Sequence, residues 1–185
     1  MRVVGGRYRG RTIECPPGVI RPAMDKMRES VFGSLGNLEG RSFLDLFAGS
    51  GSIGIEAASR GAAPVVLVER DRKKLPVTRR NAALVETAIS IAGVPAETYL
   101  RRAGTTFDIV FLDPPFDYCH KTDLLRKTAG SGVTGPHTLV LIHHPSRETL
   151  PERIEQLQRC DRRVYGGSTV SWYGRLASRS EGHLL

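Results

Sequence analysis

The amino-acid sequence predicts an α/β protein built on a mainly parallel sheet with helices on both faces. Two observations support this fold class. Short apolar runs of strand length alternate with longer stretches in which apolar residues recur at helical spacing. The run at 43–47 stops at a glycine-rich turn that opens a helix, as in the first half of a nucleotide-binding βαβ unit. The length of 185 residues suits one domain.

The elements follow from the apolar pattern and the turn residues. A helix is predicted over about 23–35. Strands are predicted at about 43–47, 64–68, 88–92, 107–112 and 138–142, with a helix beginning near 53 and further helices at about 72–85, 94–102 and 120–128. Residues 151–159 are predicted to be a helix, and 163–164 and 169–173 the last two strands, around Gly166 and Gly167. The sheet would then have seven strands.

The beginning of the chain is strongly basic within a protein of net charge +8. Residues 1–28 hold seven basic and two acidic residues, and residues 2–14 alternate loosely, as in a small β-hairpin. Arginines with Tyr8 among them suit phosphate contact and stacking on a base. The candidate RNA contacts are Arg7, Arg9, Arg11, Arg21 and Arg28. The alternative is a solvated edge hairpin whose charges only prevent aggregation.

This pattern divides the chain into a basic arm at 1–20, an α/β domain at 21–176 and a loose tail at 177–185. No apolar run approaches the length of a membrane span, and the start has no apolar core of a signal peptide. Three widely spaced cysteines make neither a disulfide framework nor a zinc site. The adjacent His143 and His144 would point to opposite sides of a strand, which disfavours a metal site. We expect a cytoplasmic monomer without a metal.

The glycine-rich turn predicts a ligand of the adenosine type. Gly49, Gly51 and Gly54 allow a tight turn in which a ligand lies against bare backbone. Glu69 ends the next strand, 18 residues after Gly51, close to the spacing at which an acid accepts hydrogen bonds from ribose hydroxyls. The combination of strand, glycine turn, helix and acid indicates an adenosine-type ligand more specifically than the glycines alone.

A second turn indicates what the chain does with this ligand. The strand at 107–112 runs into Asp113, Pro114, Pro115 and Phe116. The two prolines fix the backbone and remove two N–H donors, which leaves carbonyl oxygens as acceptors. Such a turn presents a carboxylate, a carbonyl oxygen and an aromatic face. It suits a planar base with an exocyclic amino group, which would donate two hydrogen bonds and stack on Phe116.

The motifs resemble a known family. L-D-L-F-A-G-S-G at 44–51 and F-L-D-P-P-F at 111–116 are similar to class I amino-methyltransferases that use S-adenosylmethionine. R-P-A-M-D-K-M-R-E-S-V-F at 21–32, R-G-A at 60–62, V-E-R-D at 68–71 and G-R-Y-R-G-R at 6–11 narrow the resemblance to the bacterial RsmD family. That family methylates the N2 amine of a guanine in 16S ribosomal RNA. The resemblance spans about residues 2–173.

The resemblance implies a Rossmann-like class I methyltransferase with a mainly parallel seven-stranded sheet, helices on both faces and a small N-terminal β-hairpin. It implies S-adenosylmethionine as cofactor and 16S rRNA as partner, free or within an assembled small ribosomal subunit. The implied cofactor contacts are Asp45, Phe47, Ala48, Gly49, Ser50, Gly51, Glu69 and Arg70. The implied catalytic residues are Asp113, Pro114 and Phe116.

The sequence departs from the family pattern at three places, one of which is that the helix after the second strand leads unusually quickly into the third strand. The family often has an acid or amide near the adenine after the third strand, where this chain has only glycine, valine, proline and alanine at 93–96. Its fifth strand usually ends in an acid, where this chain has His143 and His144. These departures bear on cofactor affinity and on the choice of target.

Three other functions use part of the same pattern. A DNA methyltransferase acting on adenine N6 or cytosine N4 shares the turn at 113–116, but it usually needs a further target-recognition domain. An NAD-dependent oxidoreductase would explain the glycine turn and Glu69 but not the turn at 113–116. A non-catalytic RNA-binding module would explain the charge but not a cofactor pocket.

Overall fold

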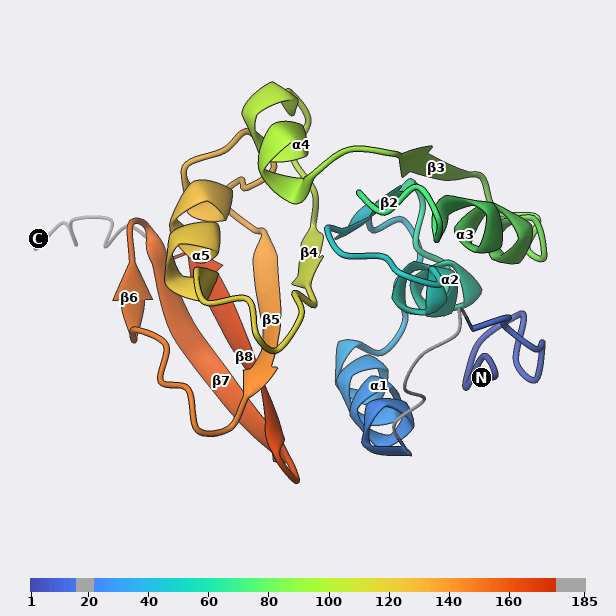
Figure 1. Ribbon diagram of the computed structural model, residues 1–185, viewed down its shortest axis with the longest axis horizontal. Coiled ribbons are helices and arrows are strands. Elements are labelled where there is room, and N and C mark those ends of the chain that lie inside the picture. The colour runs from blue at the N-terminus through green and yellow to red at the C-terminus, as the bar shows by residue number, and fades with distance from the viewer. Residues whose placement is uncertain (16–21, 176–185) are drawn as a thin grey trace, which may run out of the picture.

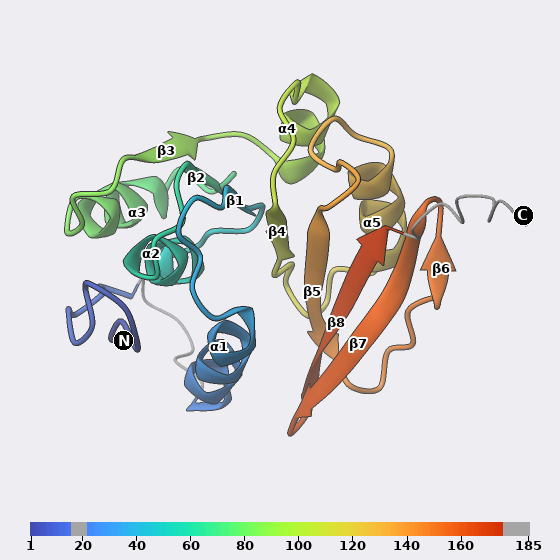
Figure 2. The same ribbon diagram turned by 180° about the vertical axis from the view of Figure 1, so that it is seen from behind.

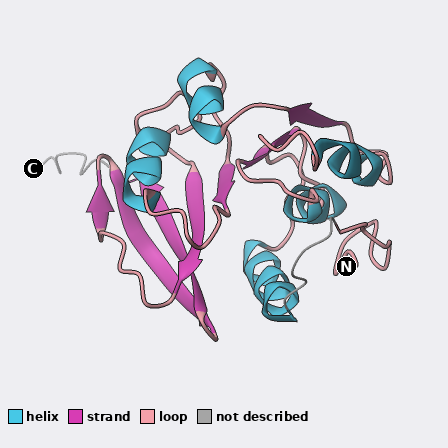
Figure 3. Ribbon diagram, in the orientation of Figure 1, coloured by secondary structure: helices cyan, strands magenta, loops and turns pink. Residues whose placement is uncertain are grey.

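The computed structural model describes residues 1–15 and 22–175 (Figure 1). Arg21 and the tail predicted at 177–185 lie outside the described residues. The elements in chain order are α1 (Pro22–Leu35), β1 (Phe43–Asp45), α2 (Ser52–Ser59), β2 (Val65–Val68), α3 (Leu75–Ala82), β3 (Ile89–Ala92), α4 (Ala96–Arg102), β4 (Ile109–Leu112), α5 (Lys121–Ala129), β5 (Leu139–Pro145), β6 (Arg153–Ile154), β7 (Leu157–Tyr165) and β8 (Ser168–Arg175). Figure 3 shows helices and strands alternating up to β5, with β6, β7 and β8 together at one end.

The strands form one sheet in the order β3-β2-β1-β4-β5-β8-β7-β6. Strands β1 to β5 are parallel, and β8, β7 and β6 continue the sheet with antiparallel pairs. The chain order reverses at β1, which pairs with β2 on one side and with β4 on the other. Ligands of α/β sheets bind at such a point, outside the carboxyl ends of the strands. The predicted, mainly parallel sheet is confirmed.

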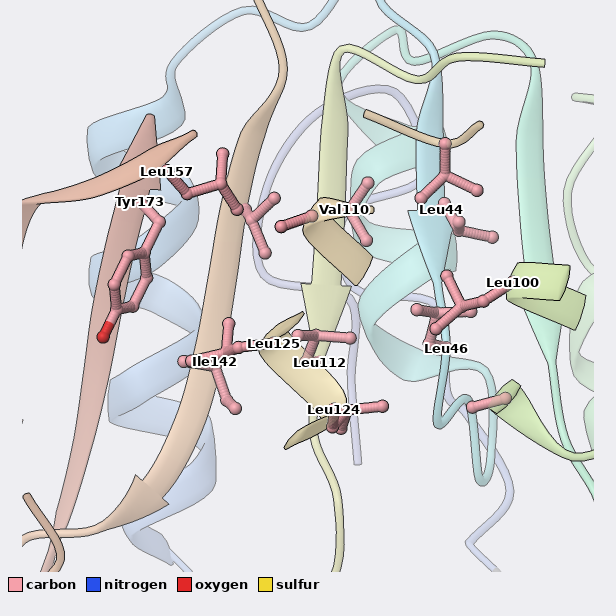
Figure 4. Close-up of a cluster of buried hydrophobic side chains, with 14 of the residues drawn as sticks. Leu44, Leu46, Leu100, Val110, Leu112, Leu124, Leu125, Ile142, Leu157 and Tyr173 are labelled. Carbon is pink, nitrogen blue, oxygen red and sulfur yellow. The ribbon is translucent and has the colours of Figure 1, made fainter. Parts of the chain in front are cut away.

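Two apolar clusters cover the two faces of this sheet. On one face, α4 and α5 pack leucines such as Leu100 and Leu124 against Val110 and its strand neighbours (Figure 4). On the other face, α1 and α2 pack against the same strands, and Phe32 of α1 stacks on Phe43 of β1 with ring centres 6.0 Å apart. The prediction of helices on both faces is therefore confirmed.

The helix predicted at 151–159 is wrong. The chain there forms β6 and the start of β7, joined by a tight turn in which Glu155 has a φ of 49°. Ile154 and Leu157 are three residues apart, which resembles helical spacing, but they pair with each other across this turn. Burial along β7 then alternates with a period of two, as in a strand. The sheet consequently has eight strands among the described residues, against seven predicted.

The arm, residues 1–15, is only partly a hairpin. One bridge joins Arg2 to Thr12, and the Val3 N–H donates to the Arg11 carbonyl at 3.0 Å. The segment is attached to α2 at the end of the molecule away from β6–β8 (Figures 1 and 2). Gly6 has a φ of 74° and lies so close to the Ser59 carbonyl that a Cβ there would overlap it. Only glycine fits at that contact.

A buried glutamate of α2 fixes the arm. Glu56 is completely buried, and its carboxylate accepts the Val4 N–H at 2.7 Å and the Gly5 N–H at 2.9 Å. Arg60 donates to the same carboxylate at 3.0 Å, and Arg28 Nε lies 4.0 Å from it. A buried carboxylate needs such partners, because an unpaired charge in the interior is strongly destabilising.

Candidate active site

The glycine turn follows β1 and is held from two sides. Gly49 and Gly51 have φ values of 55° and 84°, in the left-handed region that favours glycine. The Gly49 N–H donates to Glu69 Oε2 at 2.8 Å, and the Thr78 hydroxyl donates to the Gly49 carbonyl at 2.7 Å. Asn81 of α3 donates to the Ser50 carbonyl at 2.8 Å. The turn is therefore pre-formed for a ligand that approaches its backbone.

Glu69 sits at the carboxyl end of β2, as predicted, and is 7% exposed. Its two carboxylate oxygens accept the Gly49 N–H at 2.8 Å and the Asp71 N–H at 2.7 Å. A carboxylate can accept about four hydrogen bonds, so each oxygen keeps a free lone pair for a ribose hydroxyl. The same side chain therefore both shapes the glycine turn and borders the pocket beside it.

Asp45 ends β1 and is 1% exposed. Its Oδ1 accepts the Phe47 N–H at 3.2 Å, while its Oδ2 is buried without a hydrogen-bond partner among the described residues. Burial raises the pKa of Asp45 to about 8, and the nearby carboxylates of Asp113 and Glu69 contribute to that rise. A buried carboxyl with an unused oxygen, close to two other acids, is suited to receive a cationic group.

Glu69 and part of the glycine turn border a pocket of about 170 Å³ at the crevice, whereas the predicted contact Asp45 lies beneath it without lining it. Of the predicted cofactor contacts, Phe47, Gly49, Glu69 and Arg70 line it. The predicted Ala48, Ser50 and Gly51 belong to the same turn without lining the pocket. The pocket is also lined by residues that were not predicted, among them Lys74, Glu97 and Tyr118.

Glu97 and Tyr118 form a pair on the wall of this pocket. The Tyr118 hydroxyl donates to Glu97 Oε1 at 2.9 Å, and the Tyr118 ring meets Phe47 edge-on with ring centres 6.2 Å apart. Burial and the Glu97 carboxylate raise the pKa of Tyr118 to about 12, so its proton stays on the hydroxyl. Glu97 lies in the first turn of α4, one residue after the segment 93–96 that has no acid. Glu97 therefore places an acid close to the segment 93–96, where the family often has an acid or amide and this chain has none.

The turn at 113–116 leaves β4 beside this pocket and is held by β5. Asp113 and Pro115 line the pocket. Asp113 Oδ1 lies 2.8 Å from His143 Nδ1, and the Phe116 ring meets the same imidazole edge-on with ring centres 5.1 Å apart. His143 is 3% exposed, and its Nε2 has no hydrogen-bond partner among the described residues. This imidazole therefore contacts two of the three predicted catalytic residues.

The two neighbouring histidines have different surroundings. His144 Nε2 lies 2.9 Å from the Ser171 hydroxyl, and burial lowers the pKa of this imidazole, which favours its neutral form. The predicted alternation of the two rings is thus confirmed. Sequence reasoning did not foresee that His143 would reach Asp113, thirty residues earlier in the chain. No group of three His, Cys, Asp or Glu side chains in the described part of the chain could hold a metal ion.

A buried lysine holds the far end of the turn. Lys121 is 1% exposed, and its ammonium donates to the Phe116 carbonyl at 3.1 Å and to the Tyr118 carbonyl at 2.6 Å. It also pairs with Glu148 at 3.0 Å. Hydrogen bonds to a charged group are worth about 1.5–3 kcal/mol each, so Lys121 fixes this backbone firmly. No local pattern in the sequence indicates this role.

Fewer of the candidate RNA-contact residues are exposed than the sequence suggests. Arg7, Arg9 and Arg11, called the arm arginines below, are exposed, although Arg7 also pairs with Glu86. Arg28 is 2% exposed and donates to the Arg2 carbonyl at 2.6 Å and to Asp25 at 3.0 Å. Its guanidinium ties α1 to the arm and does not face solvent, so we remove it from the candidate RNA contacts.

Tyr8 is also unsuited to its predicted role. The ring is 2% exposed, and its hydroxyl accepts the Glu86 and Thr87 N–H groups at 3.1 and 3.2 Å. The Arg11 guanidinium covers it at 4.8 Å from the ring centre. The expectation that Tyr8 stacks on a base is therefore wrong, because the ring anchors the arm to the protein. A hollow of about 650 Å³ beside the arm, lined in part by Arg7 and Arg60, lies apart from Asp113.

None of the described helices is long and apolar enough to cross a membrane.

Comparison with known proteins places the chain in a family. A family model described as conserved hypothetical protein 95 matches residues 1–174. The chain is 33% identical over 180 residues to YlbH of Bacillus subtilis (strain 168), named as a candidate rRNA methyltransferase, with 94% of this chain and 98% of that protein covered. It is 33% identical over 155 residues to the ribosomal RNA small subunit methyltransferase D of Escherichia coli (strain K12), with 82% of this chain and 78% of that protein covered.

Solved structures of similar proteins have the same fold. A candidate methyltransferase of Escherichia coli, yhhF, is 30% identical with a TM-score of 0.86, and the match covers 96% of this chain and 99% of that one. A hypothetical protein of Thermus thermophilus is 30% identical with a TM-score of 0.77, and that match covers 93% of this chain and 98% of that one. The predicted methyltransferase fold is confirmed by these matches. The chain belongs to the conserved hypothetical protein 95 family, as its resemblance to the RsmD methyltransferases predicted.

Proposed function

We propose that this protein transfers a methyl group from S-adenosylmethionine to the N2 amine of a guanine in 16S ribosomal RNA. The observation that carries the proposal is the position of Asp113. Its carboxylate lines the same pocket as Glu69 and the glycine turn, and His143 holds it at 2.8 Å. A group that can receive an exocyclic amine thus borders the pocket for the methyl donor. The match to an rRNA methyltransferase supports the choice of RNA.

The residues of the pocket fit S-adenosylmethionine. Glu69 would accept hydrogen bonds from the ribose hydroxyls, and the glycine turn would lie against the ligand. The unused, buried oxygen of Asp45 would receive the cationic end of the cofactor, which would restore the charge of that carboxyl. The apolar wall of Phe47 and the polar pair Glu97–Tyr118 offer a face and an acceptor for the adenine. The cofactor supplies an activated methyl group on a sulfonium.

The protein then needs to position the acceptor and to polarise it. The lone pair of the guanine N2 is delocalised into the ring, so this nitrogen is a weak nucleophile. The Asp113 carboxylate and the Pro114 carbonyl would accept its two N–H groups and aim it at the methyl donor. They would also stabilise the positive charge that develops on the nitrogen. His143 keeps the Asp113 carboxylate in place before the substrate arrives, and Lys121 holds the far end of the same turn through the Phe116 carbonyl. We expect the protein to act in the cytoplasm, where ribosomal RNA is found.

The test is to map methylated guanines by mass spectrometry in 16S rRNA that lacks the modification. Naked 16S rRNA and assembled small subunits would each be incubated with the purified protein and S-adenosylmethionine. One guanine gaining the mass of one methylene, placed at N2 by nucleoside chromatography, is the expected result. Methylation of DNA oligonucleotides in place of RNA would overturn the choice of substrate. Calorimetry that detects NAD binding but no binding of S-adenosylhomocysteine would overturn the reaction class.

A further inference from the structure

The loop after β2 and helix α3 carry a dense group of basic side chains. Residues 70–82 hold six basic residues and one acidic residue, a net charge of +5 within a protein of net charge +8. The acid, Asp71, is partly buried, and its carboxylate accepts the Lys73 N–H at 2.9 Å. The six basic side chains are all exposed and are called the α3 surface below: Arg70, Arg72, Lys73, Lys74, Arg79 and Arg80.

Most of these cations have no acidic partner within the protein. Arg80 pairs with Glu14 of the arm at 2.8 Å, and no ion pair joins the other five to a residue in the described part of the chain. Helix α5 shows the contrast, because there Arg126 and Lys127 both pair with Asp123. A cluster of exposed cations without acids raises the local concentration of anions, so it suits an anionic partner.

Local stability does not account for the cations of the loop. Arg72, Lys73 and Lys74 come directly before α3, and the first turn of this helix has no acid. Positive charges at a helix N-terminus oppose the helix dipole, whereas Arg79 and Arg80 in the last turn are favoured by it. An anion bound along the loop would make the unfavourable charges favourable.

The α3 surface lies between the cofactor pocket and the arm. Arg70 and Lys74 line the pocket. The Asp71 N–H donates to Glu69, the acid that also holds the glycine turn. At the other end of α3, Asn81 donates to an arm carbonyl at 2.8 Å, and Figures 1 and 2 both show α3 and the arm at the end of the molecule away from β6–β8. The basic side chains thus follow the segments that connect the pocket with the arm.

We propose that the α3 surface binds the phosphate backbone of the substrate RNA, on a path from the arm to the mouth of the cofactor pocket. The inference rests on the proposed function for its partner, and it adds a contact surface outside the arm. Residues 70–82 include no aromatic side chain on which a base could stack, so their contacts are to phosphates and position the RNA without reading its sequence. The arm and α3 would hold one RNA at several phosphates while the base that reacts lies at Asp113.

The test removes three of these cations and measures RNA binding. Arg72, Lys73 and Arg79 are changed together to glutamine in what we call the α3 variant. None of the three lines the cofactor pocket, and none forms an ion pair among the described residues. The variant therefore separates binding of RNA from binding of the methyl donor.

The matched control removes the same charge elsewhere. It changes Arg126, Lys127 and Arg153 together to glutamine, on α5 and on the edge strand β6. Both variants are titrated with a 16S rRNA transcript at several salt concentrations, and their S-adenosylhomocysteine affinities and melting temperatures are measured. A difference between them in RNA binding then reflects where the charge lies, because the net charge is equal.

We expect the α3 variant to bind the transcript at least tenfold more weakly than the control does. The slope of log affinity against log salt should fall by about two, since each phosphate contact with a single strand contributes about 0.7. In methylation assays the loss should appear in KM rather than in kcat. The melting temperature should not fall below the wild-type value, because two of the three removed charges oppose the helix dipole.

This design keeps two failures apart. If both variants bind the transcript equally and with the same salt slope, while the wild-type protein methylates it, the α3 surface does not bind RNA and the proposed function stands. If the α3 variant alone loses RNA binding but the wild-type protein methylates no guanine, the proposed function fails and the surface stands. Loss of sedimentation with phosphatidylserine vesicles in the α3 variant, without a change in RNA binding, would assign the surface to a membrane and overturn the proposal.

Discussion

Replacing Asp113 tests the catalytic assignment most directly. Asp113→Ala removes the carboxylate that we place on the acceptor nitrogen, where charge appears only as the methyl group moves. Such a loss falls on the chemical step. One oxygen of Asp113 is used by His143 at 2.8 Å, which leaves the other for the amine. A preorganised contact of this kind is worth about 3–4 kcal/mol, so the rate of transfer should fall roughly a hundredfold to a thousandfold.

The assay is a single-turnover measurement at saturating S-adenosylmethionine with a 16S rRNA transcript. Melting temperature and S-adenosylhomocysteine affinity serve as controls for fold and pocket. A small loss of stability, about 1 kcal/mol, is expected because the buried His143 loses its hydrogen bond. Methyl transfer to guanine by Asp113→Ala at near the wild-type rate would show that the turn is structural.

His143 extends this test because it acts through Asp113. His143→Ala alone should slow transfer about threefold to tenfold, since the carboxylate loses the contact that orients it. In the Asp113→Ala background the same change should have almost no effect, because residues that act as a unit are not additive. An equal cost in both backgrounds would mean that His143 contributes independently of Asp113.

The remaining predictions concern the pocket and the arm. Glu69→Ala should weaken S-adenosylhomocysteine binding by about 1–3 kcal/mol in calorimetry. Glu69→Gln should not restore it, because the amide NH₂ would face one of the two N–H groups, of Gly49 and Asp71, that the carboxylate now accepts; full affinity of the glutamine variant would contradict this. The pKa of Asp45 is raised from 3.8 to about 8, so between these pH values the folded protein holds a proton there that the unfolded chain has lost. The free energy of unfolding contributed by this proton therefore decreases as pH rises from about 4 to 8. Asp45→Asn should flatten that loss in thermal melts across this range, and an unchanged slope would assign it to other groups. Alanine at all three arm arginines should flatten the salt dependence of RNA binding while leaving S-adenosylhomocysteine affinity unchanged; an unaltered salt slope would place the RNA elsewhere.

The parts of the fold and site that could be predicted depend on local chemistry. The glycine turn, Glu69 and Asp113 each follow a predicted strand within a few residues, and the parallel sheet brings the ends of those strands to one edge. The helix predicted at 151–159 is wrong because the local pattern there fits two structures equally well. Ile154 and Leu157 have a spacing that occurs both in a helix and across a two-strand turn, and only the pairing partner distinguishes them.

The parts that could not be predicted depend on contacts between distant segments. His143 meets Asp113 across thirty residues, and Tyr118 meets Glu97 across twenty-one. Tyr8 looked like an exposed aromatic among arginines, but Thr87, 79 residues away, supplies the partner that buries it. Arg28 similarly has one of its partners, the Arg2 carbonyl, on another segment. A side chain's partner in space is set by the packing of the sheet, which a single sequence does not display.

The attachment of the arm through Glu56 fixes the separation between the arm and the glycine turn. Helix α2 begins directly after the glycine turn and carries Glu56 and Ser59, which hold the arm, near its other end. Eight helical residues span about 12 Å, and a helix of this kind does not stretch. If the arm binds phosphates while a base lies at Asp113, the distance between those phosphates and that base would therefore be fixed. An unfolded RNA strand meets that requirement only at an entropic cost, whereas a folded RNA with the right spacing meets it at once. The fixed length of α2 would therefore favour a folded RNA in which the phosphates and the target base have this separation.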